Sequence, residues 1–383
     1  MKSRAGIIHG VGQDWQIEDI EVDAPKVGEV LVEWKAAGLC HSDEHLVTGD
    51  MVPPAEALEM MGIEFFPFIG GHEGAGVIVE VGPGVTSVAV GDHISASFVP
   101  SCGTCRYCST GRQNLCNAGA GTFVGGMITD GTSRHHLSSD GTELNMFAKL
   151  GTFSQYSCVA ESQVIKVASD LPLEAVALVS CGVATGWGSA TSRADVSPGD
   201  SVVVVGVGGI GMNAVQGAAM AGARHVIAVD PVEFKREKAM EFGATHTFSS
   251  MEEAMPAVVE LTEGMLADKV IMTPSVMHGE MMTLATGLTG KGGTVVVTAV
   301  APMTQTESSV NLFELAMWNK EIKGALFGSL NPRADIPMLL NLYRDGQLKI
   351  DELITNRYTL DEINVGYQAM RDGENIRGVI VHG

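Results

Sequence analysis

The sequence predicts an α/β protein of two domains, a β-barrel-like domain followed by a doubly wound parallel sheet. Residues 1–182 contain short apolar runs separated by glycine and proline, which is typical of antiparallel strands. Residues 183–326 alternate strand-like and helix-like runs, which indicates parallel strands joined by helices. A glycine-rich turn after the first of these strands supports the same interpretation.

The expected elements can be placed in chain order. Strands of the first domain are expected at 29–34, 75–81 and 91–96. The second domain is expected to contain strands at 201–205, 225–229, 269–272 and 294–298 and helices at 233–242 and 251–263. Residues 327–383 form the third segment, which we expect to return to the first domain. It is expected to hold helices at 335–345 and 360–372 and a strand at 378–382.

Composition limits the partners. Of the 383 residues, 45% are hydrophobic and 18% are charged, and the formal net charge is −21. Nucleic acids and anionic membranes attract basic surfaces, so neither is expected as a partner. Charged residues interrupt the N-terminal segment, so we expect no signal peptide and a cytoplasmic protein. In that setting the cysteines indicate metal binding or catalysis before disulfides.

Four cysteines lie within one short, polar stretch, spaced Cys-x2-Cys-x2-Cys-x7-Cys. Four thiolates this close can surround one ion as a tetrahedron, and zinc is the ion that prefers such a set. A closed site of four sulfurs leaves no position for a substrate, so this zinc would be structural. Two disulfides are the alternative. The four residues are Cys102, Cys105, Cys108 and Cys116.

A glycine motif follows the strand expected at 201–205 and opens a helix. Such glycines permit a tight turn, a close approach of the backbone to a pyrophosphate, and close packing of helix on strand. Asp230 ends the next strand, where an acid accepts hydrogen bonds from ribose hydroxyls and repels a 2′-phosphate, so NAD is favoured over NADP. Lys235 and Arg236 lie just beyond and act against that preference. The alternative is a glycine turn without a ligand. The glycines are Gly206, Gly208, Gly209 and Gly211.

Three further residues could hold a second metal. Cys40, His72 and Cys181 each stand in a glycine-rich stretch, and a lone residue of this kind in such a stretch is more often a core residue than a ligand. Three protein ligands would leave a fourth position for a substrate oxygen, as a catalytic zinc requires. Cys158 follows a strand-like run and is interpreted as a core residue.

The chain resembles the zinc-dependent medium-chain alcohol dehydrogenases over essentially its whole length. The resemblance implies a GroES-like catalytic domain, a Rossmann domain and a catalytic zinc on Cys40, His72 and Cys181. It also implies that Glu73 stands behind the metal and that Asp43 is oriented toward it. The stretches that carry the resemblance are 38–43, 71–76, the four-cysteine stretch, 130–134, 152–156, 181–185, the glycine motif and 375–378.

The same resemblance implies a path for the proton of the alcohol. Ser42 would take it and pass it through the cofactor ribose to His45, an imidazole suited to neutral pH. The alternatives are a turn serine and a surface histidine. Thr185 is implied under the nicotinamide, and Phe98 and Val300 as pocket walls, with Trp187 and Phe147 as pocket, interface or core aromatics. The residues implied around the adenosine and phosphates are His41, Lys235 and Arg377.

The finer pattern is similar to the actinobacterial nicotinoprotein alcohol dehydrogenases, which are assayed with a nitrosoaniline dye. This implies NAD that stays bound and is reoxidised in place by a second substrate or carrier. The rival functions are an ordinary alcohol dehydrogenase with exchanging NAD and a non-catalytic zinc- and NAD-binding sensor. A homo-oligomer is expected. The stretches are 100–103, 115–121, 230–236, 324–332 and 367–370.

Three positions depart from the wider family. His41 stands where many relatives have an arginine against the pyrophosphate, which weakens that contact. Residues 46–69 form a longer segment than usual, rich in Met and Phe, which is expected either to reshape the substrate entrance or to pack on the core as a lid. Residues 117–121 lack the arginine of the glutathione-dependent enzymes, so glutathione adducts are not expected as substrates.

Overall fold

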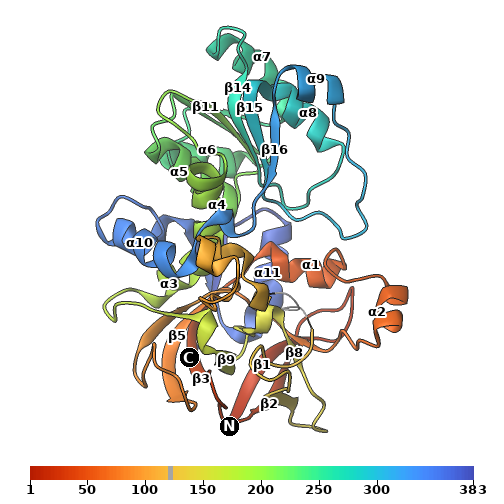
Figure 1. Cartoon of the computed structure of the whole chain (residues 1–383), viewed down its shortest axis with the longest axis vertical. Coiled ribbons are helices and arrows are strands. Elements are labelled where there is room, and N and C mark those ends of the chain that lie inside the picture. Colours follow the sequence, from red (N-terminus) through yellow and green to blue (C-terminus); the bar gives the residue numbers. More distant parts are fainter. Residues whose placement is uncertain (120–123) are drawn as a thin grey trace. The chain divides into compact units, whose positions relative to one another are not determined.

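The computed structural model describes residues 1–119 and 124–383, which form two compact units (Figure 1). Unit 1 contains Met1–Cys181 and Asn331–Gly383, and unit 2 contains Gly182–Leu330. The predicted fold class is confirmed, with mainly antiparallel sheets in unit 1 and a parallel sheet in unit 2.

Unit 1 is built on two sheets of short strands. One has the order β7-β2-β1-β4-β8, and the other has the order β10-β6-β5-β3-β18-β17 with β9 also paired to β3. The strands are β1 (Lys2–Ile8), β2 (Gln16–Val22), β3 (Glu29–Gly38), β4 (Phe68–Ile69), β5 (Gly74–Val81), β6 (His93–Ala96), β7 (His135–Leu137), β8 (Asn145–Met146), β9 (Tyr156–Ala160), β10 (Val164–Lys166), β17 (Ile354–Tyr358) and β18 (Arg377–Val381).

The C-terminal segment belongs to the same sheet as β3. Strand β18 pairs antiparallel with β3, with Val379 opposite Gly38, and β17 adds a parallel strand beside it. The end of β3 and the start of β18 therefore lie together, just before Cys40. The helices of unit 1 are α1 (His41–Thr48), α2 (Ala55–Met61), α3 (Leu173–Leu178), α10 (Pro332–Arg344) and α11 (Ile363–Arg371).

The stretch 130–134 has a structural role. The Nη2 and Nε groups of Arg134 both donate to the carboxylate of Glu29, at 2.8 and 2.9 Å, and both side chains are fully buried. The thiol of Cys158 also donates to Glu29 (3.4 Å), which agrees with its prediction as a core residue. A buried charge is tolerated only when it is paired and hydrogen-bonded, so this fork fixes the start of β3.

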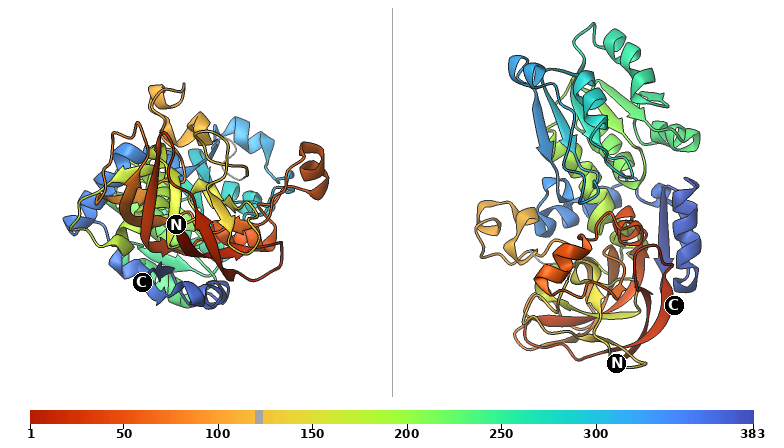
Figure 2. Two further views of the ribbon diagram at one scale, coloured as in Figure 1. Left: turned by 90° about the horizontal axis from the view of Figure 1, so that it is seen from below. Right: turned by 90° about the vertical axis from the view of Figure 1, so that its right-hand side faces the viewer.

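Unit 2 is a parallel sheet with the order β13-β12-β11-β14-β15-β16. Its core is aliphatic, with Val203, Ile227, Val270 and Val295 fully buried on four neighbouring strands. The chain runs from β11 through α5 to β12 and through α6 to β13, and then returns through α7 to β14 on the other side of β11. Because such crossovers are right-handed, α5 and α6 cover one face of the sheet and α7 and α8 cover the other (Figure 2). The strands are β11 (Ser201–Val205), β12 (His225–Val229), β13 (His246–Phe248), β14 (Ala267–Met272), β15 (Thr289–Val297) and β16 (Glu321–Gly324).

The predicted helices of the second domain are present, with ends that differ by one or two residues. The helix predicted at 360–372 is instead a 3-10 turn followed by α11, and Thr359 and Glu362 form a capping box at the start of the turn. The helices of unit 2 are α4 (Ala184–Gly188), α5 (Gly209–Met220), α6 (Glu233–Glu241), α7 (Met251–Leu261), α8 (Met281–Leu288) and α9 (Leu312–Met317).

One helical stretch among the described residues, Leu173–Arg193, is long and apolar enough to cross a membrane. The structure buries 83% of its apolar window, as is typical of a core helix.

Candidate active site

Unit 1 brings together four buried side chains that can hold a metal ion. One ligand atom from each of Cys40, His72, Glu73 and Cys181 lies within 4.8 Å of every other. Cys40 stands between β3 and α1, His72 and Glu73 precede β5, and Cys181 follows α3. Two thiols and an imidazole are the ligand types that zinc prefers, so the donor set fits that ion.

The two thiols influence each other strongly. A hydrogen bond from Cys181 lowers the pKa of Cys40 well below its usual value, and the same contact raises the pKa of Cys181. A divalent cation would stabilise both thiolates, and its binding would release any proton that they hold.

Carboxylates support the cluster from behind. Asp43 Oδ2 lies 2.9 Å from His72 Nδ1, and its Oδ1 accepts the backbone N–H of Gly71 at 2.7 Å. This contact leaves Nε2 of His72 as the nitrogen available to a metal. Although burial opposes it, the charges of Asp43 and Cys40 raise the pKa of His72. The predicted orientation of Asp43 toward the site agrees with this geometry.

Arg377 pairs with Glu73 inside the same cluster. Its Nη2 donates to Glu73 Oε2 and to the backbone carbonyl of Leu39 (3.1 Å). Burial, opposed by the charge of Arg377, raises the pKa of Glu73 to about 7. A Cβ on Gly38 would stand 2.1 Å from Glu73 Oε2, so only glycine leaves room for this pair. The sequence suggested Arg377 as a cofactor contact and gave no sign of the ion pair.

Helix α1 carries three further residues of the predicted site, His41, Ser42 and His45. Ser42 Oγ lies 3.7 Å from Cys40 Sγ, which places this hydroxyl beside the cluster. His45 is only 2% exposed, so it is not a surface histidine, and its Nδ1 lies 3.0 Å from Asp50 Oδ2. The rings of His41 and His45 are 6.5 Å apart.

Two aromatic rings flank the imidazole of His72. Phe98 and Phe147 meet it edge to face, with centroids 5.7 and 5.1 Å away. The sequence predicts Phe98 as a pocket wall and leaves Phe147 open as a pocket, interface or core aromatic. Residues 46–69 are partly packed on the core, through buried Phe65 and Phe68, while Met60 on α2 is exposed.

The four-cysteine stretch forms a compact lobe of three 3-10 turns. The sulfurs of Cys102 and Cys108 are 3.9 Å apart, and the backbone N–H groups of Cys105 and Cys108 point at sulfurs, at 3.4 and 3.5 Å. Despite burial, such N–H groups lower the pKa of Cys102 to about 6. All seven cysteines are free thiols, so the disulfide alternative is wrong. Cys116 completes the metal-binding group, and residues 120 and 121 of the stretch 117–121 lie outside the described residues.

Unit 2 holds the glycine motif between β11 and α5, where Gly208 and Gly209 start the helix. Gly206 has φ +84°, and a Cβ there would stand 2.5 Å from Thr273 O. A Cβ on Gly211 would stand 1.9 Å from Gly206 O, so this turn requires both glycines. The free N–H groups at the start of α5 suit a pyrophosphate.

Asp230 follows β12 and is 6% exposed. Its Oδ2 accepts the N–H of Val207 and its Oδ1 accepts that of Val232, both at 2.9 Å. Arg236 on α6 donates to the carbonyls of Asp230 and Pro231, both at 2.8 Å. Arg236 is therefore committed to the backbone, so it does not offset the preference of Asp230 for an unphosphorylated ribose. Lys235 lies beside it on α6, and Thr185 is buried on α4.

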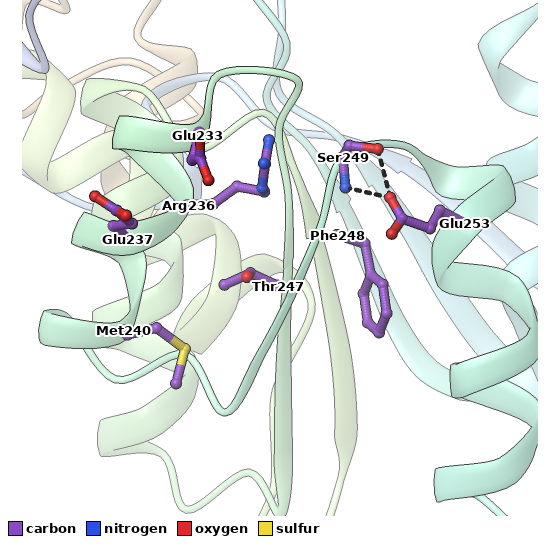
Figure 3. A pocket seen from close by; sticks show the side chains of 8 residues that line it. All are labelled: Glu233, Arg236, Glu237, Met240, Thr247, Phe248, Ser249 and Glu253. Carbon is purple, nitrogen blue, oxygen red and sulfur yellow. Dashed lines mark hydrogen bonds between the residues drawn. The ribbon is translucent and has the colours of Figure 1, made fainter.

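An open groove of about 500 Å³ lies between helix α6 and strand β13. Figure 3 shows Arg236 between α6 and β13, opposite Ser249, whose hydroxyl binds Glu253. The other lining residues are mostly acidic or apolar, namely Glu233, Glu237, Met240, Thr247 and Phe248. The groove has an acidic surplus, which is unsuited to a phosphate.

Comparison with known proteins gives the family. Residues 26–169 match the model of the alcohol dehydrogenase GroES-like domain, and residues 209–345 match that of the zinc-binding dehydrogenases. The chain is 52% identical over 382 residues to the NDMA-dependent alcohol dehydrogenase of Amycolatopsis methanolica, covering 100% of this chain and 99% of the other. It is 37% identical over 388 residues to the S-(hydroxymethyl)glutathione dehydrogenase of Paracoccus denitrificans, covering 100% of both.

A solved structure agrees. The benzyl alcohol dehydrogenase of Acinetobacter calcoaceticus matches with a TM-score of 0.89 and 30% identity, covering 100% of both chains. The donor sets of the two cysteine clusters and the glycine turn fit the zinc and NAD of such enzymes. The chain therefore belongs to the zinc-containing medium-chain alcohol dehydrogenases, with zinc and NAD as its cofactors.

Proposed function

We propose that this chain oxidises a small alcohol to an aldehyde, or performs the reverse reaction, with NAD that stays bound through the cycle. The observation that carries the catalytic part is the convergence of Cys40, His72 and Cys181 in one buried cluster. When bound there, zinc supplies Lewis-acid polarisation of a substrate oxygen, and NAD supplies the hydride acceptor. The four-sulfur lobe would hold a second, structural zinc.

The surrounding residues have separate roles in this proposal. Asp43 orients His72, and the Glu73–Arg377 pair holds a carboxylate behind the three ligands. Ser42, beside Cys40, accepts the hydroxyl proton of the alcohol and passes it toward His45. Phe98 and Phe147 exclude water around the imidazole.

The cofactor contacts are proposed from the glycine turn and from the family resemblance. The glycine turn with Gly206, Gly208, Gly209 and Gly211 would bind the pyrophosphate, and Asp230 with Lys235 the adenosine ribose. His41, Thr185 and Arg377 are carried over from the family resemblance. Since Nη2 of Arg377 is used by Glu73 and Leu39, a phosphate contact falls to its other nitrogens. Among the described residues, its Nε has no hydrogen-bond partner.

The retained cofactor is supported by the relative from Amycolatopsis methanolica, which is named for an external acceptor, the nitrosoaniline dye NDMA. Such an acceptor would reoxidise the reduced cofactor in place. The alternative is an ordinary alcohol dehydrogenase that exchanges NAD, and His41 favours it, because a neutral imidazole holds a phosphate less firmly than an arginine. We place the protein in the cytoplasm, in agreement with its seven free thiols.

The spectrum of the purified protein tests this choice. We expect nicotinamide to be released on denaturation although none was added, because a slow off-rate keeps the cofactor bound through purification. Primary alcohols should then be oxidised with NDMA, without accumulation of free NADH from added NAD. Cofactor-free protein that reduces added NAD in bulk would identify the ordinary enzyme instead.

We also propose a homo-oligomer, formed through the open edge of the parallel sheet. Strand β16 is an edge strand, and the apolar residues Phe313 and Met317 on the preceding helix α9 are 70% and 65% exposed. Glu321 and Lys323 flank Ile322 on β16. An antiparallel pairing of two copies about Ile322 brings each Glu321 opposite the Lys323 of the other copy, which stabilises the pair. A second copy of this chain is therefore the partner that fits this edge.

A further inference from the structure

We propose that Asp50 is a positioning residue for His45. Its carboxylate accepts the Nδ1–H of the imidazole and so leaves Nε2 as the atom that receives the proton from the alcohol. This inference rests on the proposed function and assigns a residue to it that no sequence motif indicated.

The local backbone explains how Asp50 reaches the imidazole. Helix α1 ends at Gly49, which has φ +87°, a left-handed conformation that reverses the chain. The N–H of Met51 then binds the carbonyl of His45 at 3.1 Å. The turn thus folds Asp50 back onto the last turn of α1, where the side chain of His45 emerges.

The contact itself is well defined. Asp50 Oδ2 lies 3.0 Å from His45 Nδ1 and accepts the hydroxyl of Thr48 at 2.6 Å. The side chain of His45 is 3% exposed, whereas that of Asp50 is 21% exposed. The imidazole is therefore sealed from water, and the carboxylate is its link to the solvent.

This arrangement fixes the chemistry of the ring. A neutral imidazole carries one proton, and the nitrogen that faces a carboxylate keeps it. With Nδ1–H held by Asp50, the lone pair of Nε2 is free to accept. When the O–H bond of the alcohol breaks, each hydroxyl of the chain receives one proton and gives up another, and the last of these protons forms the N–H bond at Nε2. The alcohol is left as an alkoxide, and the ring gains one positive charge, which the carboxylate of Asp50 stabilises.

The other charged groups near His45 do not replace Asp50. His41 is the nearest titratable ring, 6.5 Å away, and it carries no negative charge. Glu44, the neighbour of His45 on α1, is paired with Arg371 at 2.7 Å. In the described part of the chain, Asp50 is thus the carboxylate paired with His45.

The tautomer can be measured without any turnover. In histidine-labelled ¹⁵N protein as purified, with H45Q used to assign the signal, we expect Nδ1 of neutral His45 to give a protonated shift and Nε2 an unprotonated one. In D50N the ring should lose this fixed tautomer, because an amide can donate a hydrogen bond to Nδ1 as well as accept one from it. A proton on Nε2 in the wild-type protein would overturn the proposal.

Kinetics provide the second test. D50N should lower kcat about tenfold with KM little changed, less than the roughly 10²-fold loss expected when a base itself is removed in H45Q. In the H45Q background D50N should have no further effect, because the two residues act as one unit. Glu56→Gln, an exposed charge removal on the nearby helix α2, is the matched control and should behave like the wild type. Zinc content should be unchanged in all variants.

The outcomes separate the two levels of the argument. A wild-type protein that oxidises no alcohol would reject the proposed function. An active wild type in which D50N has full activity, or in which D50N costs the same in the H45Q background, would reject the role of Asp50 alone.

Discussion

At the scale of single residues, Lys149 is a buried charge close to the metal cluster. Ala148 and Lys149, the two residues after Phe147, have φ of +51° and +59°. Phe147 itself touches His72. The ammonium donates to the carbonyls of Val124 and Gly125, and among the described residues it has no carboxylate partner. Burial lowers the pKa of Lys149 from 10.5 to about 8. The free-energy cost of burying this ammonium therefore falls on the strained turn that follows Phe147.

This pKa predicts how stability depends on pH. Between about pH 8 and pH 10.5 the folded chain holds one proton fewer than the unfolded chain, so stability rises with pH in this window by up to roughly 3 kcal/mol. Below pH 8 both states are protonated and the full cost of burial is present. K149M lacks this titration. Urea unfolding at pH 7.5 and pH 10.5 should therefore show the wild type gaining stability relative to K149M. An equal difference at both pH values would contradict the predicted burial of a charged amine.

The sequence predicted Cys40, His72 and Cys181 because ligand residues stand in stretches that the family resemblance identifies. It did not indicate Asp50, Lys149 or the steric role of Gly38. Their roles depend on where a turn reverses and on which atoms of distant segments meet, and one-dimensional spacing carries neither.

At the scale of elements, we expect the four-cysteine lobe to depend on a bound metal for its fold. Its turns bury only Cys108 and Asn114, and two contacts tie it to the C-terminal segment. Gln113 N–H binds Asn331 at 2.8 Å, and Arg333 binds Ser101 O at 3.3 Å. So little apolar burial cannot offset the entropy of ordering the loop, so zinc binding must contribute the remainder.

Removing one cysteine from each cluster should give different results. C105A should lose about one zinc per chain and expose the lobe, because structural zinc binding contributes folding free energy. Trypsin cleavage after Arg106 and Arg112, both in the lobe, should accelerate. C40A should also lose about one zinc and all activity but keep the lobe resistant to trypsin. A fully active, trypsin-resistant C105A protein would falsify the structural assignment.

Elements with strong patterns were predicted well. The predicted strands at 201–205 and 225–229 coincide with β11 and β12, because buried parallel strands are continuous apolar runs. Strands β4 and β8 span two residues each, too short for any alternation to appear. They pair with each other across more than seventy positions of the chain, with Phe68 opposite Asn145, which no local pattern indicates.

At the scale of the whole molecule, the residues that carry the chemistry are divided between two units. The sequence distinguishes these units by their patterns of strand-like and helix-like runs. The metal cluster, including Cys181, lies entirely in unit 1, and the glycine turn with Asp230 lies in unit 2. The change from short strands to alternating strands and helices near residue 183 predicted the fold class. The sequence did not predict which strand the C-terminal tail pairs with, because the pairing of β18 with β3 joins residues more than three hundred positions apart.

The association of two copies of the chain is also a property of the whole molecule. If two copies pair through β16, E321K places Lys opposite Lys twice, once on each side of the two-fold axis. Two cross-strand pairs of up to about 1 kcal/mol each are lost, and repulsion is added, so association should weaken roughly tenfold or more. The double variant E321K/K323E restores opposite charges with the order reversed and should restore association. K238E, a charge reversal on α6, should leave it unchanged. Light scattering after size-exclusion chromatography over a concentration series measures all four proteins. Because the pairing is symmetric, recovery in the double variant requires that each strand meet its own copy, whereas monomeric wild type or unaffected E321K would place the interface elsewhere.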